Sequence, residues 1–400
     1  MTPIRPLRVL FVCHSASRNG ATILLLQLIR WLKPQGEWEI HVLIHGDGAL
    51  AEDFAAVATT TIWRDPSTAL DALFRRKGEA LRTFVEHAVG RTQLPARRFD
   101  LIYANTVAVL PSVRLLARKG CPILWHVHEL EYAIRMLSSE TEWRAVVGAA
   151  TRFVAVSQAV KRMLHDTFGV PARSIDVAAG FSPLRAVPPD ERRRRRSQVL
   201  TRLGWPEDAF VVGGCGIPGW RKGTDLFLQI AKKVVDGADL RDFRFLWVGG
   251  VQGSREWLEF QHDLRKLNLQ GRVQLVADSS EVADHYCSMS AFALTSREDP
   301  FPLVALEAAE YHVPVLCFDG AGGTMDFVAH DAGISVPYLD IERFASELID
   351  LHDHADRCER LTQVAYQKVH ATYCVEVQGP KIVETMRACV ADPPAVAWAQ

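Results

Sequence analysis

Residues 211–234 read VVGGCGIPGWRKGTDLFLQIAKKV, an apolar strand followed by a glycine-rich loop and an amphipathic helix. A strand that is apolar throughout is typical of a parallel sheet covered by helices on both faces. Arg221 and Lys222 lie in the loop, where two cations beyond a strand's carboxyl end can neutralise a diphosphate. The lysine is not followed by Ser or Thr, so the loop is not a Walker A motif. The stretch predicts an α/β fold with a phosphate-binding loop, and a solvated Arg-Lys turn is the alternative.

The same alternation of short apolar runs and longer amphipathic ones continues in both directions from this stretch. It predicts an α/β protein built from doubly wound parallel sheets. The expected strands are Arg8–Cys13, Ile40–Ile44, Leu101–Ala104, Ile123–Val127, Phe153–Val156, Val211–Cys215, Arg244–Val248, Val273–Val276, Ala291–Thr295 and Val313–Cys317. The expected helices include Thr22–Leu32, Ser157–Thr167, Asp225–Val235, Ser254–Leu267 and Leu303–Tyr311.

A break in this alternation marks the domain boundary. Residues 181–190 (FSPLRAVPPD) show no strand or helix period and contain three prolines, which indicates a linker. We expect one domain over residues 1–185 and a second over 186–375, with a helical segment at about 376–400 that can cross back onto the first. Because ligands of such sheets bind beyond the carboxyl ends of the strands, two facing domains would form a single cleft.

Composition excludes several classes of protein. With 400 residues, 48% hydrophobic and 23% charged, the chain is ordinary globular protein and not a disordered one. A formal net charge of −1 gives no overall sign of a nucleic-acid partner. The eight cysteines are scattered without a CxxC pair, which favours reduced thiols over disulfides or a zinc site. Neither a signal peptide nor a membrane span is evident, so we expect a cytoplasmic protein.

The most informative stretch is SREDPFPLVALEAAEYHVPVLCFDGAGG, residues 296–323. A strand ends just before it, Glu298 and Asp299 occupy the turn, and Pro302 pre-sets the first turn of the next helix. Amides at the start of that helix can hold phosphate oxygens. Glu307 lies in its first two turns among apolar neighbours, where an unpaired carboxylate is costly. It can accept two adjacent hydroxyls of a ribose or a sugar.

This segment resembles the retaining GT-B glycosyltransferases of family 4, also called glycosyl transferases group 1. Their mark is a pair of carboxylates with seven residues between them, as in Asp299 and Glu307 here, followed by a helix and a strand. The glycine loop after the first strand, the HVHEL segment, the AVSQAV segment and the RKG loop also fall in the family's order. The resemblance implies the GT-B fold, two doubly wound Rossmann-like domains that face each other across a cleft.

The resemblance also implies roles for individual residues. Glu307 would bind the ribose of a nucleotide sugar, and Asp299, or Glu298 as the alternative, would hold the donor sugar. The diphosphate would lie against Arg221, Lys222, Gly20 and the amides around Leu303 and Val304. His128 would lie near the reacting centre, with Asn105 in the same cleft. His126 and His128 are expected to point to opposite faces of the sheet, with His128 toward the cleft.

Two residues depart from the family's pattern. The first carboxylate is usually a glutamate, whereas the spacing here selects Asp299. The arginine that usually follows the glycine of the second-domain loop is replaced by Ile217, which leaves its task to Arg221.

The expected reaction is transfer of a sugar, with retention of configuration, from a nucleoside diphosphate sugar to a hydroxyl of a saccharide or lipid-linked acceptor. Bacterial polysaccharide or glycoconjugate assembly is the usual setting of the family. No cofactor or metal is expected, since no DxD pair appears and cations and helix amides can stabilise the leaving diphosphate. Two alternatives stay open: a non-catalytic protein that binds sugars or nucleotide sugars, and a GT-B sugar-nucleotide epimerase. A phosphorylase would normally be much longer, and a dehydrogenase is disfavoured by the missing GxGxxG.

Two basic segments invite a second interpretation. Residues 74–98 mix Arg and Lys with Phe, Leu and Val, and can contact an anionic membrane surface or close over a lipid-linked acceptor. An ordinary surface insertion is the equal alternative. The five arginines 192–196 are interpreted as a solvated helical face, with a patch that binds anions or nucleic acid as the alternative.

Overall fold

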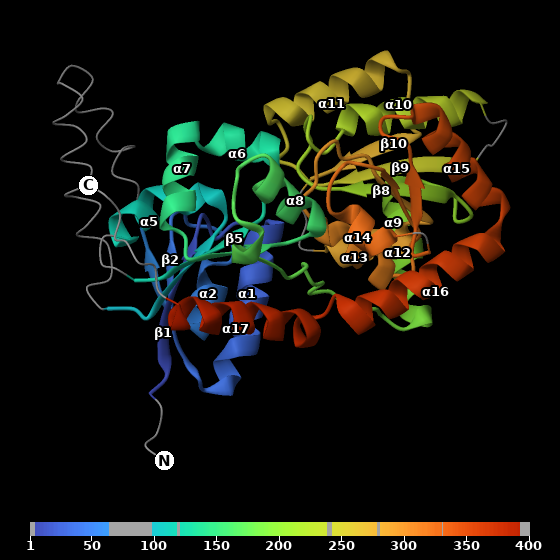
Figure 1. Cartoon of the computed structure of the whole chain (residues 1–400). Helices are drawn as coiled ribbons and strands as arrows, with labels where there is room; N and C mark the ends of the chain where they lie inside the picture. Colours follow the sequence, from blue (N-terminus) through green and yellow to red (C-terminus); the bar gives the residue numbers. More distant parts are fainter. Residues whose placement is uncertain are drawn as a thin grey trace. The chain divides into compact units, whose positions relative to one another are not determined.

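The computed structural model describes residues 5–63, 98–117, 121–237, 242–277, 281–329 and 331–392. Its contacts divide the chain into two compact units, one of Met1–Ala179 with Val375–Gln400 and one of Gly180–Cys374 (Figure 1). The boundary expected near residue 185 lies just beyond this division. The basic segment 74–98, for which membrane contact was considered, lies outside the described residues except for Arg98.

The described residues of the first unit form a parallel sheet in the order β3-β2-β1-β4-β5-β6-β7. Val12 pairs with Leu43 on one side and with Ala104 on the other. The order reverses direction between β1 and β4, which makes this a doubly wound sheet with its switch point there. The strands are β1 (Leu7–Cys13), β2 (Trp38–Ile44), β3 (Thr59–Ile62), β4 (Leu101–Asn105), β5 (Ile123–Val127), β6 (Arg152–Ala155) and β7 (Ile175–Val177).

Helices accompany this sheet. The first of them, α1, begins where the Asn19 side chain accepts a hydrogen bond of 3.0 Å from the Thr22 amide, which caps the helix. Its apolar stripe, including Leu25 and Ile29, is buried. The helices of this unit are α1 (Gly20–Leu32), η1 (Lys33–Gln35), α2 (Ala51–Val57), η2 (Val107–Val109), α5 (Leu110–Ala117), α6 (Glu131–Leu137), α7 (Glu140–Ala149), α8 (Gln158–Asp166), η3 (Ala172–Ser174) and α17 (Val375–Ala391).

The C-terminal helix α17 packs on the first unit, against α1, β4, β5 and β6 (Figure 1). Gly379 permits the approach to α1, because a Cβ there would lie 2.8 Å from the Trp31 ring. Ile382 and Met386 are fully buried. The segment expected to cross back onto the first domain is therefore a helix in contact with it.

The second unit repeats the architecture with the order β10-β9-β8-β11-β12-β13, again with parallel pairs. Its switch point lies between β8 and β11. The strands are β8 (Phe210–Cys215), β9 (Phe243–Val248), β10 (Val273–Val276), β11 (Ala291–Leu294), β12 (Val315–Phe318) and β13 (Ile334–Val336). The helices are α9 (Pro189–Leu203), α10 (Thr224–Gly237), α11 (Arg255–Lys266), α12 (Val282–Ser288), α13 (Leu303–Glu310), α14 (Thr324–Val328), α15 (Ile341–Asp353) and α16 (Ala355–Thr372).

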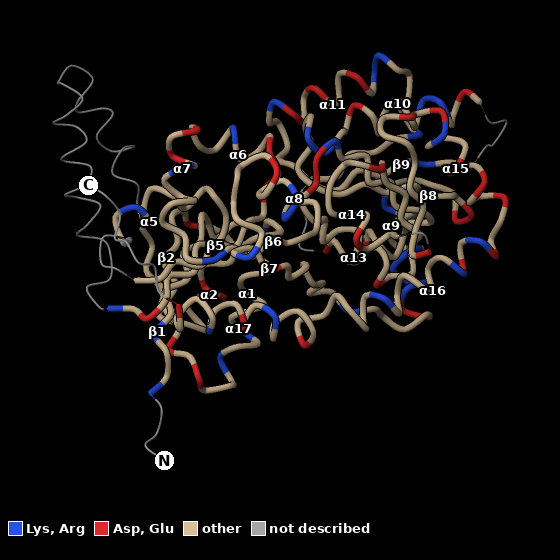
Figure 2. Tube along the Cα trace, in the orientation of Figure 1, with Lys and Arg blue, Asp and Glu red and all other residues tan. Residues whose placement is uncertain are grey.

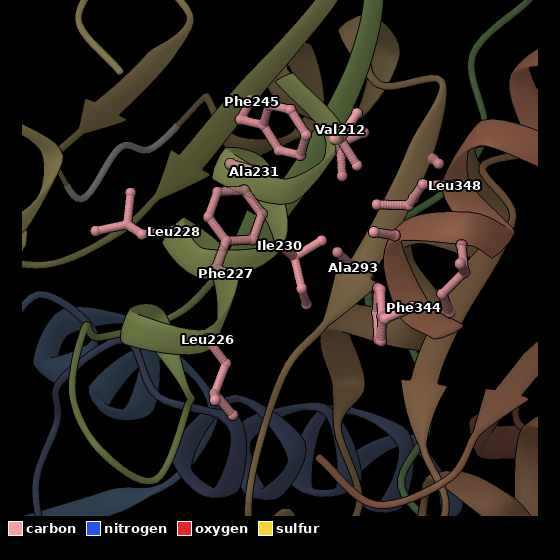
Figure 3. Close-up of a cluster of buried hydrophobic side chains, with 14 of the residues drawn as sticks. Val212, Leu226, Phe227, Leu228, Ile230, Ala231, Phe245, Ala293, Phe344 and Leu348 are labelled. Atoms are coloured by element: carbon pink, nitrogen blue, oxygen red, sulfur yellow. The ribbon is translucent and has the colours of Figure 1, made fainter. Parts of the chain in front are cut away.

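The core of the second unit is apolar and aromatic. Figure 3 shows Phe227 and Ile230 of α10 directed toward side chains of the sheet. The Phe227 and Phe245 rings meet edge to face, with centroids 5.8 Å apart. Charged residues of both signs line outer helices such as α11 and α16 (Figure 2). The quoted stretch 211–234 therefore forms the β8–α10 unit at the centre of this sheet, as its pattern predicts.

Candidate active site

The loop between β8 and α10 is fixed by a close approach to the strand beside it. Gly223 has a positive φ of 64°, and a Cβ there would lie 2.0 Å from the Thr295 carbonyl oxygen. The Thr295 hydroxyl in turn donates to the Gly223 carbonyl at 2.9 Å. This contact holds Arg221 and Lys222 beside the loop that follows β11, which is where ligands of a doubly wound sheet bind.

Lys222 meets Asp299 across the switch point. Its Nζ lies 2.6 Å from Asp299 Oδ2, which also accepts a hydrogen bond of 3.1 Å from Ser296 Oγ. Arg221 lies 4.0 Å from the same oxygen and donates to the Glu298 carbonyl at 3.0 Å. Burial opposes ionisation of Asp299, but the charges of Lys222 and Arg221 outweigh it and hold the pKa of that carboxyl below its usual value. Asp299 is thus an ionised, nearly buried carboxylate.

The backbone of Asp299 is fixed as firmly as its side chain. Its amide donates to the Ala321 carbonyl at 2.7 Å, and its carbonyl accepts from the Gly323 amide at 2.9 Å. Among the described residues every hydrogen bond to its carboxylate uses Oδ2. Oδ1 therefore remains an acceptor for a ligand hydroxyl. The half-buried Glu298 lies one residue earlier, with its carbonyl on Arg221.

Glu307 of α13 is buried and held by a residue outside the expected motifs. Tyr286 Oη, from α12, donates to Glu307 Oε2 at 2.8 Å. Burial raises the pKa of Glu307, although the Tyr286 hydrogen bond and the Lys222 charge both act to lower it. Leu303 and Val304 form the first turn of α13, so their amides are among those that the helix itself leaves unpaired. The second unit thus brings together the cations, carboxylates and helix start expected of a nucleotide-sugar site.

The expected residues of the first unit also come together, at the carboxyl ends of β1, β4 and β5. Asn105 is the last residue of β4, and its Nδ2 donates to the Ala21 carbonyl at 3.1 Å. Its Oδ1 lies 2.9 Å from His128 Nε2. Because Oδ1 can only accept, this contact places a proton on His128 Nε2 and leaves Nδ1 as the acceptor nitrogen. Gly20 is the first residue of α1, beside this contact.

The expectation that His126 and His128 point to opposite faces is wrong. Their ring centroids are 4.1 Å apart, since residues i and i+2 of a strand project on the same side. Tyr103 Oη and His126 Nδ1 form a hydrogen bond of 2.5 Å beneath this pair. Burial lowers the pKa of His126 to about 3, and burial together with the neighbouring His126 and His14 lowers that of His128. Both imidazoles are therefore neutral at pH 7.

Glu129 holds the His128 backbone, and the Thr106 amide donates to the His126 carbonyl at 3.0 Å. Glu129 is 7% exposed and accepts hydrogen bonds from the amides of Val107 and His128, at 3.1 and 2.9 Å. Thr106 has φ 81°, an unfavourable backbone conformation for a β-branched residue. The Trp125 indole donates to its carbonyl at 2.9 Å and helps to hold it there. The HVHEL segment was visible in the sequence, whereas no pattern pointed to Thr106.

Within the described ranges, no group of three or more His, Cys, Asp or Glu side chains is arranged to hold a metal ion. In the same part of the chain, no helix is both long and apolar enough to cross a membrane.

The profile of the glycosyl transferases group 1 matches residues 207–354, and that of glycosyltransferase family 4 matches residues 18–179. The chain belongs to glycosyltransferase family 4. Among curated relatives of this family 4 chain, the amylovoran biosynthesis glycosyltransferase AmsD of Erwinia amylovora is 29% identical over 55% of the chain and 58% of its own length. D-inositol 3-phosphate glycosyltransferase 1 of Catenulispora acidiphila is 27% identical over 73% of the chain and 72% of its own. The match thus spans little more than half the length of the first relative.

Solved structures show that this family 4 chain has the GT-B fold. HepE of Anabaena, solved in complex with UDP and glucose, superposes with a TM-score of 0.76 at 20% identity, over 96% of the chain and 100% of HepE. WaaG, a glycosyltransferase involved in lipopolysaccharide biosynthesis, superposes with a TM-score of 0.71 at 14% identity, over 94% of the chain and 99% of WaaG.

Proposed function

We propose that this chain transfers a sugar from a nucleoside diphosphate sugar to a hydroxyl of a saccharide or glycolipid, with retention of configuration and without a metal ion. The single observation that carries the proposal is at the switch point of the second sheet, where Lys222 pairs with Asp299 and its charge also acts on the buried Glu307. A site for a nucleotide sugar needs cations for the diphosphate and carboxylates for the hydroxyls, and both are present there. The relatives AmsD and D-inositol 3-phosphate glycosyltransferase 1 support the class of reaction.

Each of these residues binds a different part of the donor. Lys222 has three N–H donors, so it can keep its contact with Asp299 while it binds a phosphate oxygen. Arg221 and the first amides of α13 add positive potential where charge develops on the departing diphosphate, which lowers the barrier without a metal ion. Glu307 accepts the ribose hydroxyls, and Asp299 Oδ1 accepts a hydroxyl of the sugar.

In the first unit, the family resemblance gives Asn105 and the neutral His128 the role of hydrogen-bonding the sugar. A neutral imidazole suits this role, because a cation there would oppose the positive charge that develops on the sugar ring as the glycosidic bond breaks. No protein nucleophile is required if the departing phosphate accepts the acceptor's proton on the same face of the sugar. We place the reaction in polysaccharide or glycoconjugate assembly, as for AmsD and WaaG.

A panel of UDP-, GDP-, ADP- and dTDP-sugars tests the proposal by thermal shift, with and without EDTA. We expect one donor class to raise the melting temperature in EDTA, and Glu307→Ala to abolish the effect. Glu259→Ala, which removes an exposed glutamate of α11 that pairs with Arg255, is the control. NMR of the product with the matching donor reports the anomeric configuration. A donor that binds but is never transferred would favour a non-catalytic protein, and conversion of the donor sugar alone would favour an epimerase. No shift with any donor would remove the proposal's support.

A further inference from the structure

The five-arginine run on α9 divides into two groups by its partners. Arg193, Arg194 and Arg195 each pair with a carboxylate, on Asp190 or Glu191. Arg195 also reaches Asp284 of α12 at 2.8 Å. These three arginines form the charged outer face that the sequence predicts.

The other two arginines of the run, Arg192 and Arg196, differ. Arg196 donates to the carbonyls of Ser288 and Ala209, at 2.5 and 2.6 Å. The Arg192 guanidinium forms no ion pair or hydrogen bond with any other described residue. Burial lowers the pKa of both guanidinium groups, and the charge of Arg196 lowers that of Arg192 further. Arg192 and Arg196 are thus half-buried and lack a carboxylate partner among the described residues, whereas Arg193 and Arg194 are exposed.

Both arginines line a cavity of about 610 Å³. The cavity lies at the amino ends of β11 and β12, since Ser290 and Pro314 of its wall come directly before these strands. The candidate active site follows the carboxyl ends of β8 and β11, so the two sites lie at opposite edges of one sheet. The wall contains Arg192, Arg193, Arg196 and His312, against one carboxylate, Glu359.

We propose that this cavity binds a phosphoryl group, carried by a small organic phosphomonoester or a lipid headgroup. A guanidinium presents a planar fork of N–H donors that matches phosphate oxygens, and Arg192 has this fork unused. Arg192 and Arg196 are like charges four residues apart on one helix, a repulsive arrangement that a bound anion would relieve. The Ser290 hydroxyl supplies a further hydrogen bond, and Met289 and Pro314 supply apolar contact for the organic part. The volume is in the range of small-molecule sites.

The test compares Arg192→Ala with Arg194→Ala in the full-length chain. Both remove one positive charge from α9, but Arg194 is exposed, pairs with Glu191 and does not line the cavity. Titration calorimetry with glycerol 3-phosphate should give the same affinity for the wild type and Arg194→Ala, and about tenfold weaker binding for Arg192→Ala. Binding of phosphate near Lys222 is common to all three proteins, so it cancels in the comparison.

A second probe separates the two sources of the phosphoryl group. Phosphatidylcholine vesicles with and without phosphatidate are sedimented with the same three proteins. Arg192-dependent sedimentation without a response to glycerol 3-phosphate assigns a lipid headgroup, and the converse assigns a soluble phosphomonoester. If Arg192→Ala fails to fold by circular dichroism, Arg192→Lys and Ser290→Ala take its place, since Lys keeps the charge and loses the fork. Equal binding of Arg192 and Arg194 variants to both probes would overturn the proposal.

Discussion

Tyr286 illustrates how a residue outside every motif can position a ligand contact. It is fully buried, and its hydroxyl donates to Glu307. Tyr286→Phe keeps the ring and removes the hydrogen bond, so the Glu307 carboxylate loses the contact that would orient it toward the ribose that we propose it binds. We expect the KM for the donor to rise about tenfold with little change in kcat, because a hydrogen bond to a charged group contributes about 1.5–3 kcal/mol.

Steady-state kinetics on the donor identified above measures this change. Tyr311→Phe is the control, since its ring stacks on Tyr286 with centroids 5.9 Å apart and its hydroxyl makes no described hydrogen bond to Glu307. Equal KM values for Tyr286→Phe and the wild type would show that α13 alone orients Glu307.

Glu307 carries a cost in stability that its proposed contact with the ribose would explain. The pKa of Glu307 in the folded chain is raised above the usual 4.5. Below pH 4.5 the carboxyl is protonated in both the folded and the unfolded chain, so it costs no stability. The free energy of unfolding falls as the pH rises through the folded pKa. Glu307→Gln should therefore melt above the wild type at pH 7.5 and like it at pH 4. Melting curves across this range check the sign. Donor binding should be lost in the variant, and an unchanged difference at all pH values would contradict the titration argument.

The Lys222–Asp299 pair makes stability depend on pH in the opposite direction. The pKa of Asp299 is lowered, so its contribution to stability is present above pH 3.8 and is lost as the pH falls through the folded value. Lys222→Met leaves a nearly buried carboxylate without its closest cation, which should cost about 3 kcal/mol in unfolding free energy. Adding Asp299→Asn should recover part of that loss. Urea unfolding of the wild type, both single variants and the double variant measures the coupling, and strictly additive effects would argue against the pair.

At the residue scale, the sequence identified the side chains whose chemistry and spacing are unusual. Asp299, Glu307 and Lys222 stand in short motifs, so their proximity follows from the order of the strands. The partner of Glu307 could not be predicted, because α12 reaches α13 only through the packing of the sheet's helices.

The loop that joins β8 to α10 depends on one glycine. A Cβ at Gly223 would lie 2.0 Å from a backbone oxygen, and φ is positive there. We expect Gly223→Ala to cost about 3 kcal/mol or more and to separate Lys222 from Asp299. Gly237→Ala is the control, because no other described residue lies within 4 Å of its Cβ position and its φ is not positive. Denaturant unfolding compares the two, and equal stabilities would mean that the loop can shift at no cost.

At the element scale, central strands were predicted more completely than peripheral ones. The β5 strand agrees at both ends with the expected Ile123–Val127, because an apolar run buried on both faces leaves a continuous signal. The edge strand β3 reads TTTI and was missed, as were the short strands β7 and β13. The strand expected at Val313–Cys317 lies at Val315–Phe318, since Pro314 before it cannot donate to the ladder.

At the scale of the whole molecule, the order of the strands depends on information that the local sequence pattern does not contain. Each sheet reverses direction at its first strand, β1 or β8, and that strand's glycine-containing loop is where a ligand can approach. Strand order cannot be read from local pattern, and the GT-B resemblance implied only that each sheet is doubly wound. Local pattern did mark the helix after residue 375, and only tertiary contacts show that its apolar face covers β4, β5 and β6.

The return of α17 to the first unit gives the last prediction. Deleting residues 375–400 removes buried Ile382 and Met386 and the hydrogen bond of 3.1 Å between Thr385 and Asp176 of β7. Because these contacts belong to the first unit, hydrogen exchange should accelerate in β4, β5 and β6 and stay unchanged in β8 and β9. Deleting only residues 393–400 keeps α17 whole and serves as the control. Faster exchange in both sheets after the longer deletion would mean that the units unfold together, and α17 would then stabilise the whole chain through the first sheet.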